Sequence, residues 1–141
     1  MFLREAEPMS AEAARLMNPL RLAYLGDTVW ELLIRSRLVY AGKNVRHMHQ
    51  GAIAGVNAQA QAQALHRVEP LLSPEESAIV LRGRNAHSRH PVPRHQSPAD
   101  YQAATALEAL IGYLYLTGQE ERLLQLFQYT QQEAEPCQRS N

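Results

Sequence analysis

Apolar residues recur at intervals of three and four along most of the chain, which is the period of an amphipathic α-helix. The clearest example runs from residue 20 to about residue 40, where one face carries Leu22, Leu25, Val29, Leu32 and Leu33. A shorter one covers residues 119–131, with Leu123, Leu124 and Phe127 on one face. No segment alternates apolar and polar residues for long enough to indicate a strand. The pattern therefore predicts an all-α protein folded as a helical bundle.

Capping residues and prolines set the ends of the predicted helices. Ser73 precedes Pro74, and Glu76 follows three residues after Ser73, which is the pattern of a capping box. Ser97 and Pro98 give a second start of the same kind. We expect helices over residues 10–17, 20–40, 44–67 with a break near residue 51, 73–84, 97–116 and 119–131. The proline-containing segment between the fourth and fifth of these, residues 85–96, is expected to be an exposed loop.

Length and composition indicate a single domain with an ordinary core, because 45% of the 141 residues are hydrophobic and 20% are charged. The single cysteine, Cys137, can form no intrachain disulfide, which fits a reducing compartment and excludes cysteine-based metal sites. No apolar stretch approaches the ~20 residues of a membrane span. We expect a cytoplasmic protein with no membrane partner, organised as an N-terminal segment (1–17) with a short helix, a main domain (18–130) and a polar tail (131–141).

The net charge of zero conceals three regions of different charge. Residues 1–31 carry three arginines and five acids, residues 32–99 carry nine basic residues and three acids, and residues 100–141 carry two arginines and six acids. Thirteen of the fourteen basic residues are arginine, whose planar donor group suits phosphate. A genome rich in GC codons explains the same preference equally well. The clustering of the arginines is better evidence for a phosphate-bearing partner.

Two acidic residues lie within otherwise apolar helical segments. These are Asp27, next to Gly26, and Glu108, four residues before Gly112. A buried carboxylate needs a cation, a hydrogen-bond donor or a metal ion. If the two helices cross at their glycines, the carboxylates face one another and can share a divalent cation, for which oxygen ligands favour Mg²⁺ or Mn²⁺. From composition alone, structural ion pairs are the commoner explanation. Glu31 lies on the same face as Asp27, where it can serve as a third ligand or pair with Arg35.

Three segments in this order resemble the catalytic domain of the ribonuclease III family, and more closely its Mini-ribonuclease III branch. They are residues 24–27 (Tyr-Leu-Gly-Asp), 82–86 (Arg-Gly-Arg-Asn-Ala) and 104–116, which contains Glu-Ala-Leu-Ile-Gly at residues 108–112. The likeness covers about residues 18–127. It implies a ribonuclease III-like helical fold for the main domain. It also implies an endoribonuclease that hydrolyses phosphodiester bonds of double-stranded RNA as a homodimer, each subunit cutting one strand.

The resemblance assigns the catalytic and metal-binding roles to Asp27 and Glu108, with Mg²⁺ as the cofactor and Mn²⁺ as a substitute. Ribonuclease III itself has two further acids, at the positions of Ala23 and Thr105 in this chain. Their replacement is shared with Mini-ribonuclease III, and it leaves the number of metal ions open. The family also points to maturation of precursor 23S ribosomal RNA of the large subunit, with a ribosomal protein as a further partner.

Without a separate RNA-binding domain in this sequence, contacts to RNA must come from the catalytic domain. Duplex RNA is recognised largely by its shape and its phosphates, which requires spaced cations. The residues we expect to bind RNA are Arg82, Arg84, Asn85, Arg89 and Arg94, with Lys43 and Arg46 as a second patch. For Arg82, a charge at a helix C-terminus is an equally good explanation. Two other function classes are a catalytically silent RNA-binding module of the same fold and a purely structural helical protein.

Overall fold

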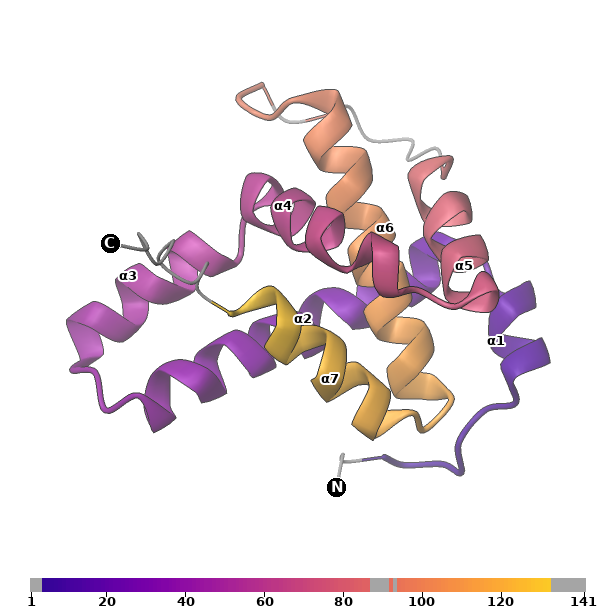
Figure 1. The fold of residues 1–141 in the computed structure, drawn as a ribbon, viewed down its shortest axis with the longest axis horizontal. Helices are drawn as coiled ribbons and strands as arrows, with labels where there is room; N and C mark the ends of the chain where they lie inside the picture. The colour runs from indigo at the N-terminus through magenta and orange to yellow at the C-terminus, as the bar shows by residue number, and fades with distance from the viewer. Residues whose placement is uncertain (1–3, 87–91, 93, 133–141) are drawn as a thin grey trace, which may run out of the picture.

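The computed structural model describes residues 4–86, 92 and 94–132, and every regular element in these residues is helical. The all-α prediction is therefore confirmed. Figure 1 shows the order of the elements along the chain. They are α1 (Ala11–Leu16), α2 (Pro19–Tyr40), α3 (Val45–Gly55), α4 (Ala58–Val68), the short 3-10 helix η1 (Glu69–Leu71), α5 (Pro74–Arg84), α6 (Pro98–Leu116) and α7 (Glu120–Thr130).

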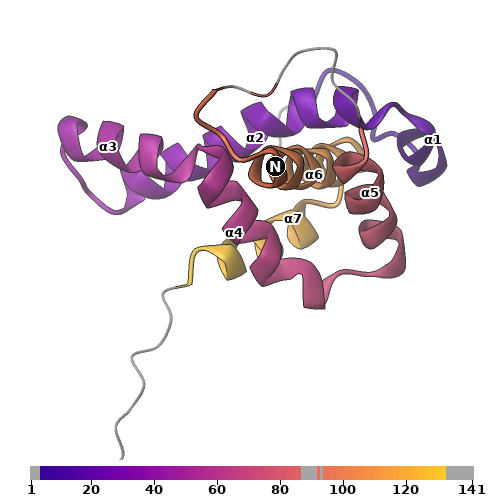
Figure 2. The same ribbon diagram turned by 90° about the horizontal axis from the view of Figure 1, so that it is seen from above.

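Helix α6 forms the centre of the bundle. Figure 2 views it nearly end-on, with α2, α4, α5 and α7 arranged around it. Ten of its residues are buried, including a continuous run from Ala109 to Leu114. A helix that is apolar on nearly all sides is stable in water only when other helices cover it. The apolar character of residues 104–116 therefore explains why this helix occupies the middle of the fold.

Most of the predicted helix boundaries are confirmed. Ser10, Ser73 and Ser97 each accept a hydrogen bond from a backbone N–H in the first turn of α1, α5 and α6. Glu76 completes the predicted capping box by accepting from the backbone N–H of Ser73. The segments after α2 and α6 turn at Gly42 and Gly118, whose φ angles of 71° and 73° favour glycine.

The predicted helix over residues 44–67 is in fact two helices, and the break does not lie at residue 51. It lies at Asn57, whose side-chain oxygen accepts from the Ala60 N–H and thereby caps α4. The amide nitrogen of the same side chain donates to the carbonyls of Ile53 and Ala54 at the end of α3, at 3.0 Å each. One asparagine thus satisfies backbone groups at the ends of both helices.

The core of the bundle lies between α6 and the helices around it. Trp30 of α2 is almost completely buried and meets Phe127 of α7 edge to face, with 5.3 Å between ring centroids. The indole N–H of Trp30 also donates to the Gly55 carbonyl at 3.1 Å, which ties the end of α3 to α2. On α7 the sequence prediction was partly wrong, because Leu126 is buried with Leu123 and Phe127 whereas Leu124 is exposed. Its face is rotated because α7 packs against both α4 and α6.

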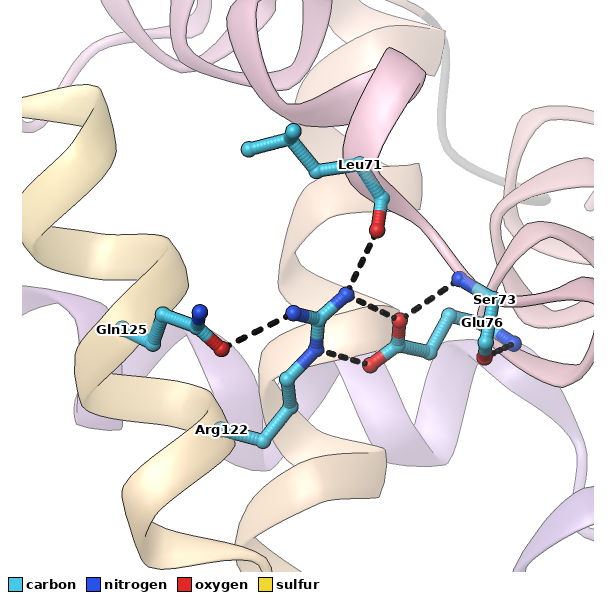
Figure 3. Close-up of polar contacts among 5 residues, drawn as sticks. All are labelled: Leu71, Ser73, Glu76, Arg122 and Gln125. Carbon is cyan, nitrogen blue, oxygen red and sulfur yellow. Dashed lines mark hydrogen bonds and ion pairs between the residues drawn. The ribbon is translucent and has the colours of Figure 1, made fainter.

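An ion pair between the partly exposed Arg122 and the buried Glu76 joins α7 to the start of α5 (Figure 3). The Arg122 guanidinium donates to both carboxylate oxygens of Glu76, at 2.8 and 2.9 Å, and to the Leu71 carbonyl at 2.7 Å. Burial raises the pKa of Glu76, but the hydrogen bonds from Arg122 and Ser73 outweigh burial, so the pKa lies below its ordinary value. Here a buried carboxylate has a complete set of donors and serves the scaffold.

Candidate active site

Helices α2 and α6 cross with their backbones in contact at two glycines. A side-chain carbon added to Gly26 would overlap the backbone carbonyl of Glu108, and one added to Gly112 would overlap the backbone carbonyl of Leu22. Neither overlap can be relieved by a side-chain rotation, because both involve backbone atoms. The two helices therefore cross at their glycines, which is the condition under which the sequence brings Asp27 and Glu108 near one another. It brings the backbone of Glu108 directly beside Gly26, the neighbour of Asp27.

The Asp27 carboxylate lies close enough to Glu108 for its charge to affect the ionisation of Glu108. Burial of Glu108 raises its pKa, the negative charge of Asp27 raises it further, and the Gln61 hydrogen bond opposes both, giving a pKa of about 8. Asp27 is more exposed than Glu108. Its pKa is also raised, mainly because partial burial disfavours the charged carboxylate, and further because of the negative charge of Glu31. Ionising both carboxylates at once is therefore costly without a cation.

A third residue of the site, Gln61 on α4, is one that the sequence analysis missed. Its side-chain amide donates to Oε1 of Glu108 at 3.1 Å. The residue is 3% exposed and lies on the buried face of α4 with Ala58, Ala64, Leu65 and Val68. The signal was present in the sequence, because Gln61 has helical spacing with the apolar positions of that helix.

Neither carboxylate has a basic partner within ion-pairing distance among the described residues. Glu31 pairs with Arg35 at 2.7 Å, as its alternative role predicted. Of the two positions where ribonuclease III has further acids, Ala23 is buried, and the Thr105 hydroxyl donates to the Tyr101 carbonyl at 3.0 Å. In the part of the chain that the structure describes, no three His, Cys, Asp or Glu side chains gather as a metal site. The acidic site therefore consists of two carboxylates and one amide.

The arginines of residues 82–86 have partners within the fold. Arg82 donates to the Met17 carbonyl at 3.1 Å and to the Arg15 carbonyl, so it caps the C-terminus of α1. Arg84 forms an ion pair with Glu69. The glycine between them packs against the backbone of Ala106, which brings α5 close to α6. These contacts give the segment a structural role, and its proposed contribution to RNA binding stays a prediction.

The other residues expected to bind RNA lie at the surface or outside the described residues. Lys43 and Arg46 are exposed at the start of α3, and Arg94 is exposed before α6. Asn85 is an exposed residue that ends α5. Arg89 lies outside the described residues. Lys43, Arg46 and Arg94 are thus exposed and can contact RNA. Among the described residues, no hydrogen bond links them to Asp27, Glu108 or Gln61.

Comparison with known proteins identifies the family of this chain. The family model for the ribonuclease III domain matches residues 20–119, which include both carboxylates. The chain belongs to the ribonuclease III family. Within the family, it is 44% identical over 127 residues to Mini-ribonuclease 3 of Symbiobacterium thermophilum, covering 89% of this chain and 92% of that protein. It is 43% identical over 122 residues to Mini-ribonuclease 3 of a Synechococcus species, covering 82% of this chain and 87% of that protein.

A crystal structure of a protein from Fusobacterium nucleatum has the same fold. Its TM-score is 0.73 at 34% identity, covering 79% of this chain and 90% of that one. The resemblance to the Mini-ribonuclease III branch is therefore confirmed. As a member of the ribonuclease III family, the chain is a ribonuclease whose substrate is RNA and whose family uses a divalent metal ion. No helix in the described residues is long and apolar enough to span a bilayer.

Proposed function

We propose that this ribonuclease is a Mg²⁺-dependent endonuclease that cleaves double-stranded RNA with Asp27 and Glu108 as its metal ligands. The observation that carries the proposal is that two acidic side chains lie at the crossing of α2 and α6 with no basic side chain to balance them in the described residues. These are Asp27 and Glu108, and burial and the charge of Asp27 raise the pKa of Glu108 to about 8. A protein retains so costly an arrangement when the charge has a use other than stability.

The donor set fits a hard divalent cation that keeps open coordination positions. Mg²⁺ in nucleic-acid enzymes is held by one or two carboxylates, with water and substrate phosphate completing its shell. Asp27 and Glu108 supply two carboxylates from two helices whose separation is fixed by Gly26 and Gly112. A bound cation would supply an activated water and stabilise the leaving oxygen of the phosphodiester. Asp27, being the more exposed of the two, is the ligand on the side that substrate can reach.

We further propose that the protein acts as a two-fold homodimer. An RNA duplex has two antiparallel strands related by two-fold axes. A symmetric dimer therefore presents one identical site to each strand, so that each subunit cuts one strand. Apolar side chains that no other helix covers lie on α2, where Tyr24, Leu32 and Val39 are 85%, 60% and 63% exposed. These residues share one face of the helix, at spacings of about two turns. Tyr24 is only three residues from Asp27, so a partner subunit on this face would border the site.

The physiological substrate that we propose is precursor 23S ribosomal RNA in the cytoplasm, with a ribosomal protein presenting the RNA. This part follows from the family resemblance alone. The decisive experiment is a cleavage assay on duplex RNA and on precursor 23S RNA, with Mg²⁺ or EDTA, while light scattering records the oligomeric state. We expect duplex cutting with Mg²⁺ only, by a dimer. Salt-dependent binding of duplex RNA without cutting at any metal concentration would instead identify a silent RNA-binding module.

A further inference from the structure

Helix α4 carries three glutamines, at positions 59, 61 and 63, and only the middle one points into the protein. Gln61 is 3% exposed, whereas Gln59 and Gln63 are both exposed. The neighbours of Gln61 on the buried face are alanines, a leucine and a valine. A polar amide in such a position costs free energy unless its hydrogen bonds are satisfied. The buried position of the Gln61 amide therefore indicates that its hydrogen bond has a specific role.

Among the described residues, Gln61 alone donates a hydrogen bond to the Glu108 carboxylate. The amide nitrogen reaches Oε1 at 3.1 Å, and Oε2 of Glu108 receives no hydrogen bond from those residues. One oxygen is thus held from α4 while the other stays without a donor. A carboxylate fixed at one oxygen has fewer rotamers available and presents the other oxygen in a defined direction.

The donor that holds Glu108 is neutral, and this distinguishes it from the donor of the other buried glutamate. Arg122 brings a positive charge to Glu76 and lowers its pKa. An amide orients a carboxylate but leaves its negative charge unbalanced, so the charge stays available to a cation. A lysine or arginine at position 61 would occupy Glu108 as an ion pair.

We propose that Gln61 is a positioning residue, which holds the Glu108 side chain in the orientation that binds the divalent cation. The inference rests on the proposed metal-binding role of Asp27 and Glu108. Gln61 makes no contact with the substrate in this scheme and acts only through Glu108. Loss of a second-layer donor of this kind weakens metal binding by about 10- to 100-fold.

The test compares Gln61→Met with Gln63→Met. Methionine has nearly the length and volume of glutamine but no donor, and it suits the apolar face of α4. Position 63 is the matched control, because it lies on the same helix but is exposed. Titration calorimetry with Mn²⁺ in the absence of RNA should show at least about 10-fold weaker binding for Gln61→Met and unchanged binding for Gln63→Met. In the cleavage assay at fixed Mg²⁺, kcat should fall while the KM for duplex RNA stays constant, and added Mg²⁺ should restore part of the rate.

Thermal unfolding in EDTA separates this role from a structural one. Gln61→Met should unfold at the wild-type temperature or above it, because a buried polar group has been replaced by an apolar one. Gln61→Asn, whose shorter amide cannot reach Glu108, serves as the second variant and should also bind Mn²⁺ more weakly. Wild-type Mn²⁺ affinity in either folded variant overturns the role of Gln61. Wild-type protein that neither binds Mn²⁺ nor cleaves RNA overturns the proposed function itself, so the two failures are distinguishable.

Discussion

Two glutamates within the bundle, the buried Glu76 and the half-buried Glu108, differ in the donors that surround their carboxylates. Glu76 lies where α5 begins and receives hydrogen bonds from Arg122 and from the Ser73 backbone, which lower its pKa. Glu108 lies in the middle of α6 and receives one hydrogen bond, from the neutral amide of Gln61. Its pKa rises to about 8, because burial and the charge of Asp27 outweigh that bond.

The Glu76 carboxylate stabilises the fold, whereas the ionised Glu108 carboxylate destabilises it. The Glu76 charge is matched by a cation inside the protein, so removing either partner leaves an unsatisfied group. The Glu108 charge has no such match, so neutralising it relieves repulsion and desolvation. Mutation should therefore affect stability strongly at Glu76 and activity strongly at Glu108. The following predictions test this division.

The largest effect is expected on catalysis. Asp27→Asn and Glu108→Gln should each lower the kcat for duplex RNA by about 1,000-fold or more, because each removes a charged ligand of the proposed metal ion. Circular dichroism and thermal unfolding should show a native fold for both variants. Cleavage within a factor of a few of the wild-type rate, or loss of the fold in either variant, would contradict the assignment.

The complementary variant is Arg122→Leu. It leaves the Glu76 carboxylate buried without its cation, and it also removes the donor to the Leu71 carbonyl. We expect a loss of about 3–5 kcal/mol in the free energy of unfolding, measured with urea. At temperatures where the variant is still folded, kcat should remain near the wild-type value. A stable Arg122→Leu protein with low activity would reverse the proposed division of roles.

The pH dependence of stability should have opposite signs at the two glutamates. Glu108 has a folded-state pKa of about 8 against an ordinary value of 4.5, so the wild type loses stability as pH rises through this interval. Glu108→Gln does not titrate there, and in EDTA it should gain about 2–4 kcal/mol on the wild type between pH 5 and 8. Glu76 has a lowered pKa, so its contribution is present at neutral pH and disappears as pH falls. Urea unfolding of the wild type and Glu108→Gln between pH 5 and 8 measures the first slope, and parallel curves for the two would rule out the raised pKa. Comparison of Glu76→Gln with the wild type below the ordinary pKa of 4.5 measures the second slope.

The smallest effect is expected from the arginines of residues 85–96, the segment between α5 and α6. Joint replacement of Arg89 and Arg94 by alanine should weaken binding to duplex RNA and reduce its salt dependence by up to about two units of slope, through lost counterion release. The kcat at saturating RNA should change less than the affinity, because these residues position the duplex. Unchanged affinity and slope would favour the patch of Lys43 and Arg46 instead, and the pair Lys43→Ala with Arg46→Ala is the matching experiment.

The fold could be predicted from the sequence wherever the signal was local. Serine caps, the capping box at Ser73 and the apolar period of α2 and α6 involve residues within one or two turns of each other, and each was confirmed. The glycines beside Asp27 and before the end of α6 also indicated the helix crossing, because glycine inside a helix is costly without a packing reason. The two carboxylates were identified because each lies in an otherwise apolar helical segment.

What the sequence did not show depends on contacts between distant segments. The break at Asn57 requires one side chain to serve the ends of two helices, and the pattern of apolar residues continues through it. The hydrogen bond of Gln61 to Glu108 depends on how α4 packs against α6. Likewise, Arg82 caps α1 rather than its own helix, a partner that no spacing rule identifies. In each case the role of the residue depends on a contact with another helix, which the local sequence pattern does not specify.

The contact of α2 with α6 at Gly26 and Gly112 has a consequence for how the chain acquires its activity. One carboxylate comes from an early helix and the other from a late one, so neither half of the chain contains a complete site. Contacts between segments so far apart in sequence form only after a large loop of chain has closed, which is the slow part of folding. An unfinished or partly opened chain therefore cannot bring the two carboxylates together. With Asp27 and Glu108 as the proposed metal ligands, we expect RNA cleavage only from molecules in which α2 and α6 have already packed together.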